Sequence, residues 1–260
     1  MNLLFIGDIF GSPGRSFLKE LLPRLREEYE VDLAIANGEN AAGGVGLTGA
    51  VAEEIFAAGV DVITSGNHIW NQKEIYPLLD TDERILRPAN YPPGAPGRGS
   101  AVYRARDGTA VGVINVCGRI YSSHNLDCPF RALDAEIAKT RASTPVIVID
   151  FHGEATSEKV AAGWHVDGRA SALLGTHTHV QTADELILPG GTAYISDVGM
   201  TGSYDEGVIG ADREAVLKYF LTQLPVRIKP AGGKRQFSAV CCTINSAGRA
   251  ERIERLLIRE

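Results

Sequence analysis

The sequence predicts an α/β layer architecture with a largely parallel sheet. Short apolar runs typical of strands alternate with segments of helical periodicity through most of the 260 residues. Ligands of such sheets bind outside the carboxyl ends of the strands, so polar residues at those ends are candidate site residues. Five apolar runs end in this way, at residues 2–8, 32–40, 61–68, 146–152 and 172–179.

Length and composition are those of one soluble domain over residues 1–260. Hydrophobic residues make up 44% of the chain and charged residues 22%, which is ordinary for a chain that buries a full core. The first apolar run lacks the pattern of a secretory signal, and no run approaches the ~20 apolar residues of a membrane span. We therefore expect a cytoplasmic protein with no membrane partner.

Charge and cysteine content narrow the partners further. A net charge of −6 argues against long nucleic acid as the main partner, because phosphate backbones bind basic surfaces. A small anion held by metals remains compatible, and the sequence leaves homo-oligomerisation open. Four cysteines without Cys-x-x-Cys spacing should be free, mostly buried thiols. They are Cys117, Cys128, Cys241 and Cys242, and the adjacent pair should point to opposite faces of a strand.

Periodic leucines and capping residues predict the helices. Leucines from Leu18 to Leu25 recur at helical spacing after a predicted loop at 11–14, and Pro23 implies a kink or an early end. Four candidate helix starts follow, at Thr48, at the capping-box pair Asn71 and Glu74, at Asp127 and at Asp212. Asp107-Gly108 predicts a hairpin, and residues 237–244 and 250–258 predict two further strands.

The polar residues at the strand ends form a donor set that suits two first-row transition metals. Carboxylate and amide oxygens bind hard cations, whereas imidazole suits iron, zinc and similar metals. With one carboxylate bridging, seven side chains suffice for two metals with open positions. The predicted ligands are Asp8, Glu39, Asn40, Asn67, His152, His177 and His179.

The pair His177 and His179 is the most specific part of this pattern. If the segment is extended, residues two apart project to one face, and both imidazoles can reach metals roughly 3.5–4 Å apart. Two polar strand residues facing solvent are the alternative. Glu39 lies in a glycine-rich run that suits a tight turn at a ligand. For Asp8, the alternatives are a helix cap or part of a phosphate-binding glycine loop.

His68 is the candidate catalytic side chain. Adjacent residues cannot easily serve one metal, so Asn67 is predicted as the ligand and His68 as a proton donor to the leaving oxygen. His124 and His165 are interpreted as structural, although the polar run around His124 could form a loop over the site. The roles of three further acidic residues stay open: Asp150, Glu154 and Asp197.

These motifs resemble those of the calcineurin-like metallophosphoesterases. The shared blocks are Gly7-Asp8, Gly66-Asn67-His68, His152 and Gly175 to His179. Within that superfamily the chain resembles the YmdB-like 2′,3′-cyclic-nucleotide phosphodiesterases over nearly its whole length, through longer blocks at 37–40, 66–70, 150–159, 175–184 and 196–200. The resemblance implies a four-layer α/β/β/α sandwich of the metallo-dependent phosphatase type.

Two positions depart from the general superfamily pattern. Phe10 stands where the first block usually carries a histidine, so one metal would lose an imidazole, which Asn40 could replace. Glu39 stands for the usual bridging aspartate. Both departures agree with the YmdB-like subgroup, and they bear on the identity of the metal rather than on the reaction.

The resemblance implies a dinuclear centre of divalent or mixed-valence iron or manganese, and hydrolysis of small phosphodiesters, most of all 2′,3′-cyclic nucleotides. Metals lower the pKa of bound water to about 7, and the resulting hydroxide would attack phosphorus. Two divalent ions, two carboxylates and one hydroxide leave a net charge of about +1, which attracts a phosphodiester and a phosphomonoester alike, so charge does not choose between them. The alternatives are a metal- and nucleotide-binding regulator with little turnover, and a dinuclear hydrolase of another bond.

Overall fold

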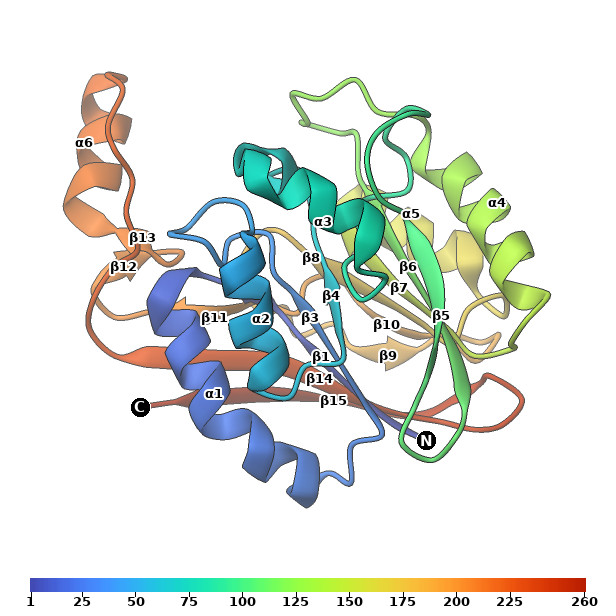
Figure 1. The fold of residues 1–260 in the computed structure, drawn as a ribbon. Coiled ribbons are helices and arrows are strands. Elements are labelled where there is room, and N and C mark those ends of the chain that lie inside the picture. The colour runs from blue at the N-terminus through green and yellow to red at the C-terminus, as the bar shows by residue number, and fades with distance from the viewer.

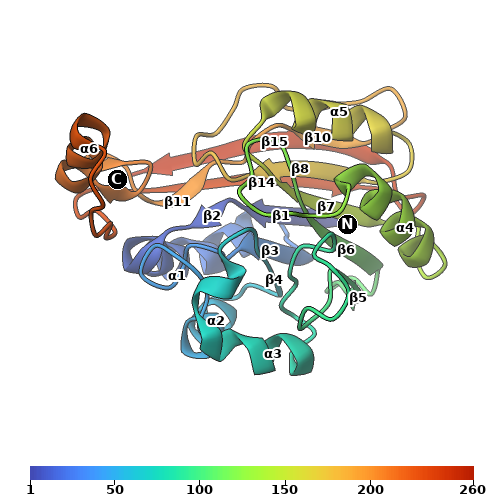
Figure 2. The same ribbon diagram turned by 90° about the horizontal axis from the view of Figure 1, so that it is seen from above.

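Two β-sheets pack face to face and carry helices on their outer faces. The computed structural model describes residues 1–260. Helices α1 (Gly11–Glu28) and α2 (Gly49–Ala57) cover one sheet, and α4 (Pro129–Arg141) and α5 (Thr156–Val166) cover the other (Figures 1 and 2). The four-layer α/β/β/α sandwich implied by the sequence is therefore confirmed.

The first sheet has the order β2-β11-β14-β1-β3-β4, with β15 paired to β14. Only its β1-β3-β4 part and the short β2-β11 pair are parallel, because the long C-terminal hairpin of β14 and β15 joins β1 in antiparallel register. The sheet is thus more mixed than the sequence predicted. Its strands are β1 (Asn2–Ile6), β2 (Asp8–Ile9), β3 (Leu33–Asn37), β4 (Val62–Thr64), β11 (Met200–Ser203), β14 (Arg235–Ile244) and β15 (Ala250–Arg259).

The second sheet has the order β5-β6-β7-β8-β10-β9. Its four central strands are parallel, and the edge strands β5 and β9 pair antiparallel. The predicted hairpin at Asp107-Gly108 joins β5 to β6. The strands are β5 (Ser100–Arg104), β6 (Ala110–Cys117), β7 (Ile147–His152), β8 (Ala172–Thr176), β9 (Leu186–Ile187) and β10 (Ala193–Ile195).

Strand alternation builds the layers. Leu3 and Phe5 of β1 face the core between the two sheets, whereas Leu4 and Ile6 face the core beneath α1 and α2. Cys241 and Cys242 divide in the same way, and all four cysteines are free, as the sequence predicted. A third core joins α4 and α5 to the outer face of the second sheet.

Several helix boundaries differ from the sequence prediction. Thr48 and Asp212 cap their helices by accepting the amide protons of Val51 and Ala215. The loop predicted at residues 11–14 is instead the first turn of α1, which continues through Pro23 to Glu28. Pro13 lies in the first turn, where a proline removes no intrahelical hydrogen bond, so this turn can stay helical.

The other two predicted caps are wrong. Pro129 begins α4, so Cys128 occupies the cap position and Asp127 lies one residue too early. The region around Asn71 and Glu74 forms two short 3₁₀ turns, η1 (Ile69–Asn71) and η2 (Lys73–Ile75), and α3 (Tyr76–Thr81) begins only after them.

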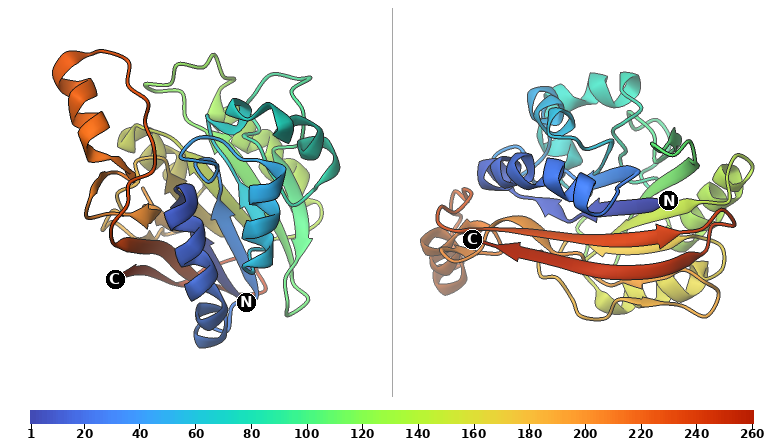
Figure 3. Two further views of the ribbon diagram at one scale, coloured as in Figure 1. Left: turned by 60° about the vertical axis from the view of Figure 1, so that its left-hand side comes forward. Right: turned by 90° about the horizontal axis from the view of Figure 1, so that it is seen from below.

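A small arm projects from the sandwich beside the first sheet. It comprises the strand pair β12 (Gly207–Val208) and β13 (Ala211–Asp212), helix α6 (Arg213–Thr222) and the return segment 223–232. Figure 3 shows α6 standing clear of both sheets. None of the helices is both long and apolar enough to cross a bilayer.

Candidate metal centre and active site

The seven predicted donor residues converge at the carboxyl ends of the parallel strands. Asp8 follows β1, Glu39 and Asn40 follow β3, and Asn67 follows β4 in the first sheet. In the second sheet, His152 ends β7, and His177 and His179 follow β8. The side chains therefore meet where the ends of the two sheets face each other, and they fall into two neighbouring groups.

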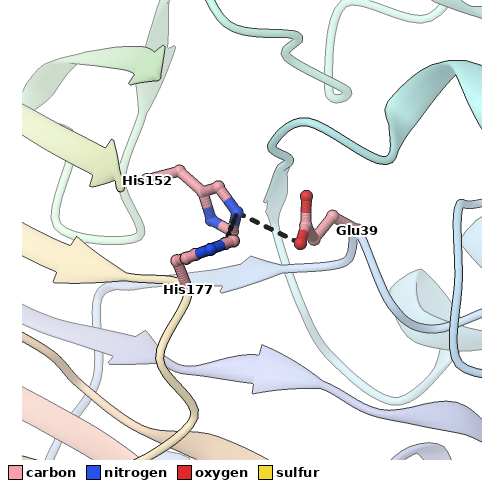
Figure 4. A group of neighbouring side chains, drawn as sticks. All are labelled: Glu39, His152 and His177. Atoms are coloured by element: carbon pink, nitrogen blue, oxygen red, sulfur yellow. Dashed lines mark hydrogen bonds and ion pairs between the residues drawn. The ribbon is translucent and has the colours of Figure 1, made fainter. Parts of the chain in front are cut away.

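The first donor group consists of Glu39, Asn67, His152 and His177. The Nε2 atom of His152 lies 3.1 Å from Glu39 Oε1, 3.1 Å from Asn67 Oδ1 and 2.9 Å from His177 Nδ1. Ligand atoms of the two histidines and Glu39 all lie within 4.8 Å of one another. Figure 4 shows both rings and the carboxylate pointing at a common centre.

The second donor group consists of Asp8, Asn40 and His179. The Nε2 atom of His179 lies 3.3 Å from Asn40 Oδ1 and 3.8 Å from Asp8 Oδ1. Asp8 Oδ1 is also 3.8 Å from His152 Nδ1, so the two groups adjoin. Phe10 supplies no donor and instead packs edge-on against the His179 ring, with the centroids 5.5 Å apart.

A buried polar network fixes the orientation of His152. Its Nδ1 atom lies 2.9 Å from the Thr176 hydroxyl, which donates to Asp150 Oδ1 at 2.7 Å. The other Asp150 oxygen accepts from Thr64 and Asn37. Because Nδ1 is engaged, Nε2 is directed into the first donor group, the orienting arrangement typical of histidine ligands. Asp150, whose role the sequence left open, thus acts through Thr176.

The two histidines after β8 lie in a loop rather than in an extended strand. Strand β8 ends at Thr176, and His177 and His179 have φ of 106° and 66°. The expectation of an extended pair with one shared face is therefore wrong, and each ring enters a different donor group. Non-glycine residues in this region cost about 1–3 kcal/mol each and are found where the surrounding structure enforces them.

A buried ion pair encloses this histidine loop. Lys159 Nζ lies 2.8 Å from Asp197 Oδ2 and donates to the Thr176 carbonyl at 3.2 Å. Asp197 accepts the amide protons of Thr178 and Gly199. Both charged side chains are 1% exposed. No sequence pattern indicated this pair, because Lys159 lies in a helix where a lysine normally faces water.

The charges of the centre are strongly coupled. Burial lowers the pKa of His152, but the carboxylates of Glu39, Asp8 and Asp150 outweigh it and raise that pKa to about 9. Burial likewise opposes ionisation of Glu39, yet the imidazole of His152 holds its pKa at about 2. Burial and the charge of His152 lower the pKa of His177 to about 3. Without metal, the protein therefore keeps a proton on His152, at the point where the donors converge.

Asp8 provides the test of whether a cation fits. Its side chain is wholly buried, and its Oδ1 atom has no hydrogen-bond donor, while Oδ2 accepts the His177 amide at 3.1 Å. Burial raises its pKa to about 7. An unpartnered buried carboxylate oxygen is costly. A divalent cation among Asp8, Asn40 and His179 would satisfy it, so the donors present fit a metal.

His68 lies at the rim of the centre, with its side chain free of the donor groups. Its amide donates to Glu39 Oε2 at 3.1 Å, and its Nδ1 lies 3.4 Å from Asn71 Oδ1. Glu154 Oε2, also at the rim, lies 3.0 Å from His177 Nε2. His124 and His165 lie outside both donor groups; His165 pairs with Asp134 on the surface.

Two cavities flank the donors. A polar pocket of about 100 Å³ is bounded by Asn67, His152, Glu154, His177 and the loop 118–124, which bears out the idea that the run around His124 lies over the site. An apolar cleft of about 710 Å³ extends from Glu39, His68 and His179 to the projecting arm. The centre is therefore open on two sides.

The two-sheet sandwich is the metallo-dependent phosphatase fold, that of the metallophosphoesterases, and the donors at its strand ends suit metal ions. The profile of the YmdB-like protein family matches residues 4–256. The chain is 51% identical to the 2′,3′-cyclic-nucleotide 2′-phosphodiesterase of Bacillus subtilis (strain 168) over 100% of this chain and 98% of that one. It therefore belongs to the YmdB-like family.

Two solved structures share the whole fold. A crystal structure of a hypothetical protein from Thermus thermophilus is 43% identical, with a TM-score of 0.93 and complete coverage of both chains. A crystal structure of a novel phosphatase from Mycoplasma pneumoniae is 32% identical, with a TM-score of 0.93, and covers 100% of this chain and 93% of that one.

Proposed function

We propose that this protein is a dinuclear-metal phosphodiesterase that hydrolyses small phosphodiesters, with 2′,3′-cyclic nucleotides as its substrates. The observation that carries the proposal is the pair of adjoining donor groups, one holding a buried carboxylate oxygen without a partner. The substrate class is supported by the name of the Bacillus subtilis relative, which is half identical in sequence.

The two donor groups suggest which residues would hold each of two cations. Glu39, Asn67, His152 and His177 would hold one cation, and Asp8, Asn40 and His179 the other. Imidazole, carboxylate and amide ligands suit first-row transition metals, and the family resemblance points to iron or manganese among them. When bound, such ions activate water and neutralise charge on the phosphate oxygens.

The residues of the chain would do the remaining work. His68 lines the apolar cleft and would donate a proton to the ribose oxygen that leaves phosphorus. In that step a P–O bond to water forms and one P–O bond of the cyclic phosphate breaks, leaving a phosphomonoester and a ribose hydroxyl. Thr176 and Asp150 keep His152 in place throughout.

A hydrolysis assay combined with metal analysis tests this proposal. Protein purified without chelator should contain iron or manganese and convert a 2′,3′-cyclic nucleotide to the ring-opened monophosphate. Glu39→Gln, which removes a carboxylate ligand, should abolish turnover, whereas Glu74→Gln, at an exposed position away from the donors, should not. Recovery of the intact cyclic nucleotide would favour a binding protein, and cleavage of amide substrates alone would favour another hydrolase.

A further inference from the structure

The apolar cleft has a wall that the phosphate chemistry does not require. The arm contributes that wall through aliphatic and aromatic side chains of β12, β13, α6 and the return segment. They include Val208, Ile209, Val216, Tyr219, Phe220 and Ile228. Tyr219 is 42% exposed and Phe220 is 65% exposed, so apolar surface faces an open space beside the donors.

The wall is joined directly to the metal centre. The Nδ1 atom of His179 lies 2.8 Å from the carbonyl oxygen of Ile209, so the arm orients a predicted metal ligand. Phe10 packs against the same histidine ring and also lines the cleft. A molecule bound at the second donor group would therefore lie against the arm.

We propose that the apolar cleft holds the base of the nucleotide, with Phe220 and Tyr219 of α6 as its main contacts. This inference rests on the proposed function and specifies where its substrate lies. Base and cyclic phosphate share one ribose ring, so a phosphate at the donors places the base in an adjoining space. The cleft volume of about 710 Å³ falls in the range of small-molecule sites, roughly 300–1,000 Å³.

The polar pocket is too small to take the same role. Its volume of about 100 Å³ is below that range, and the loop 118–124 lines it with Ser122, Ser123 and His124 as well as with Ile120 and Tyr121. It suits water or a ribose hydroxyl. The apolar cleft is therefore the cavity that can hold the base.

The chemistry of the wall also determines selectivity. The arm brings no charged or amide side chain into the cleft, and the Tyr219 hydroxyl is its one polar side-chain group there, so the arm lacks the paired donors and acceptors that read the edge of a base. Contact through ring faces and apolar surface tolerates every base, because each has a π-face. The enzyme should therefore accept all four common bases and bind purines more tightly than pyrimidines, since purines bury more apolar area.

A comparison of two substrates isolates the base contact. Adenosine 2′,3′-cyclic phosphate carries the base, and 1-O-methylribose 2′,3′-cyclic phosphate has the same reacting group without it. The variants are Phe220→Ala and the control Leu221→Ala, whose side chain is 84% exposed on the same helix and does not line the cleft. Both substrates are assayed with manganese-loaded wild type and variants.

We expect wild type to prefer the nucleotide, and Phe220→Ala to raise its KM by roughly 5- to 10-fold, the lower part of the range for loss of a base–aromatic contact. Leu221→Ala should leave both substrates unchanged, as should Phe220→Ala with the methyl riboside. Equal effects of Phe220→Ala on both substrates, or no effect, would overturn the base site while leaving the phosphodiesterase activity in place. No turnover of either substrate by wild type would refute the activity itself.

Discussion

Loss of the buried cation at Lys159 should destabilise the fold and loosen the metal centre together. In Lys159→Met a side chain of similar length keeps the packing, but Asp197 loses its cationic partner while remaining buried. Removing one member of a buried ion pair costs about 3–5 kcal/mol, because the remaining charge stays buried without compensation. For a chain of this size the loss corresponds to a fall in melting temperature of roughly 6–20 °C.

Urea unfolding of the metal-free protein measures this effect. The control is Lys139→Met, which removes an exposed lysine that is 3.1 Å from Glu136 and should cost less than about 1 kcal/mol. Manganese titration of Lys159→Met should also show weaker binding, since Lys159 and Asp197 hold the backbone on both sides of His177. Unfolding free energies of the two variants within about 1 kcal/mol of each other would show that the buried Lys159–Asp197 pair does not stabilise the fold.

Three further outcomes follow from the site. Gly66→Ala should abolish metal binding, because its Cβ would overlap Glu39 Oε2 and the His152 ring; a variant with full metal content would contradict this. Manganese affinity should fall by more than about 100-fold from pH 8 to pH 6, because metal binding displaces protons from His152 and Asp8. Without metal their pKa values are about 9 and about 7, so below pH 7 both protons must leave. An affinity that calorimetry finds independent of pH would contradict metal binding by these two residues. Asp212→Ala removes the cap of α6 and should lower the free energy of unfolding by about 1 kcal/mol in urea denaturation, with an unchanged value excluding a stabilising cap.

Local patterns in the sequence were enough to place the donors at one edge of the sheets. Each follows a short apolar run, and the carboxyl ends of parallel strands meet in space whatever the intervening loops do. Glu39 and His152, for instance, are separated by more than a hundred residues but lie 3.1 Å apart. Strand alternation likewise predicted that Cys241 and Cys242 face different cores.

Features that depend on distant partners could not be predicted in this way. The loop in which His177 and His179 take positive φ is held by bonds from the Thr178 amide to Asp197 and between the His179 ring and the Ile209 carbonyl, both later in the chain. The burial of Lys159 likewise depends on Asp197, 38 residues away. Helix α6 has a helical pattern and a cap in the sequence, but neither shows that it projects beside the metal centre.

We propose that seven side chains bind a pair of metals and that the loaded protein hydrolyses a cyclic phosphate. The most direct measurement is the rate of 2′,3′-cyclic AMP hydrolysis by chelator-treated protein as manganese is added in known molar amounts. We predict no turnover without metal and a rate that rises until two equivalents per chain are bound. Full activity in the presence of chelator, or a rate unchanged by added manganese and iron, would show that the seven donors do not hold catalytic metals.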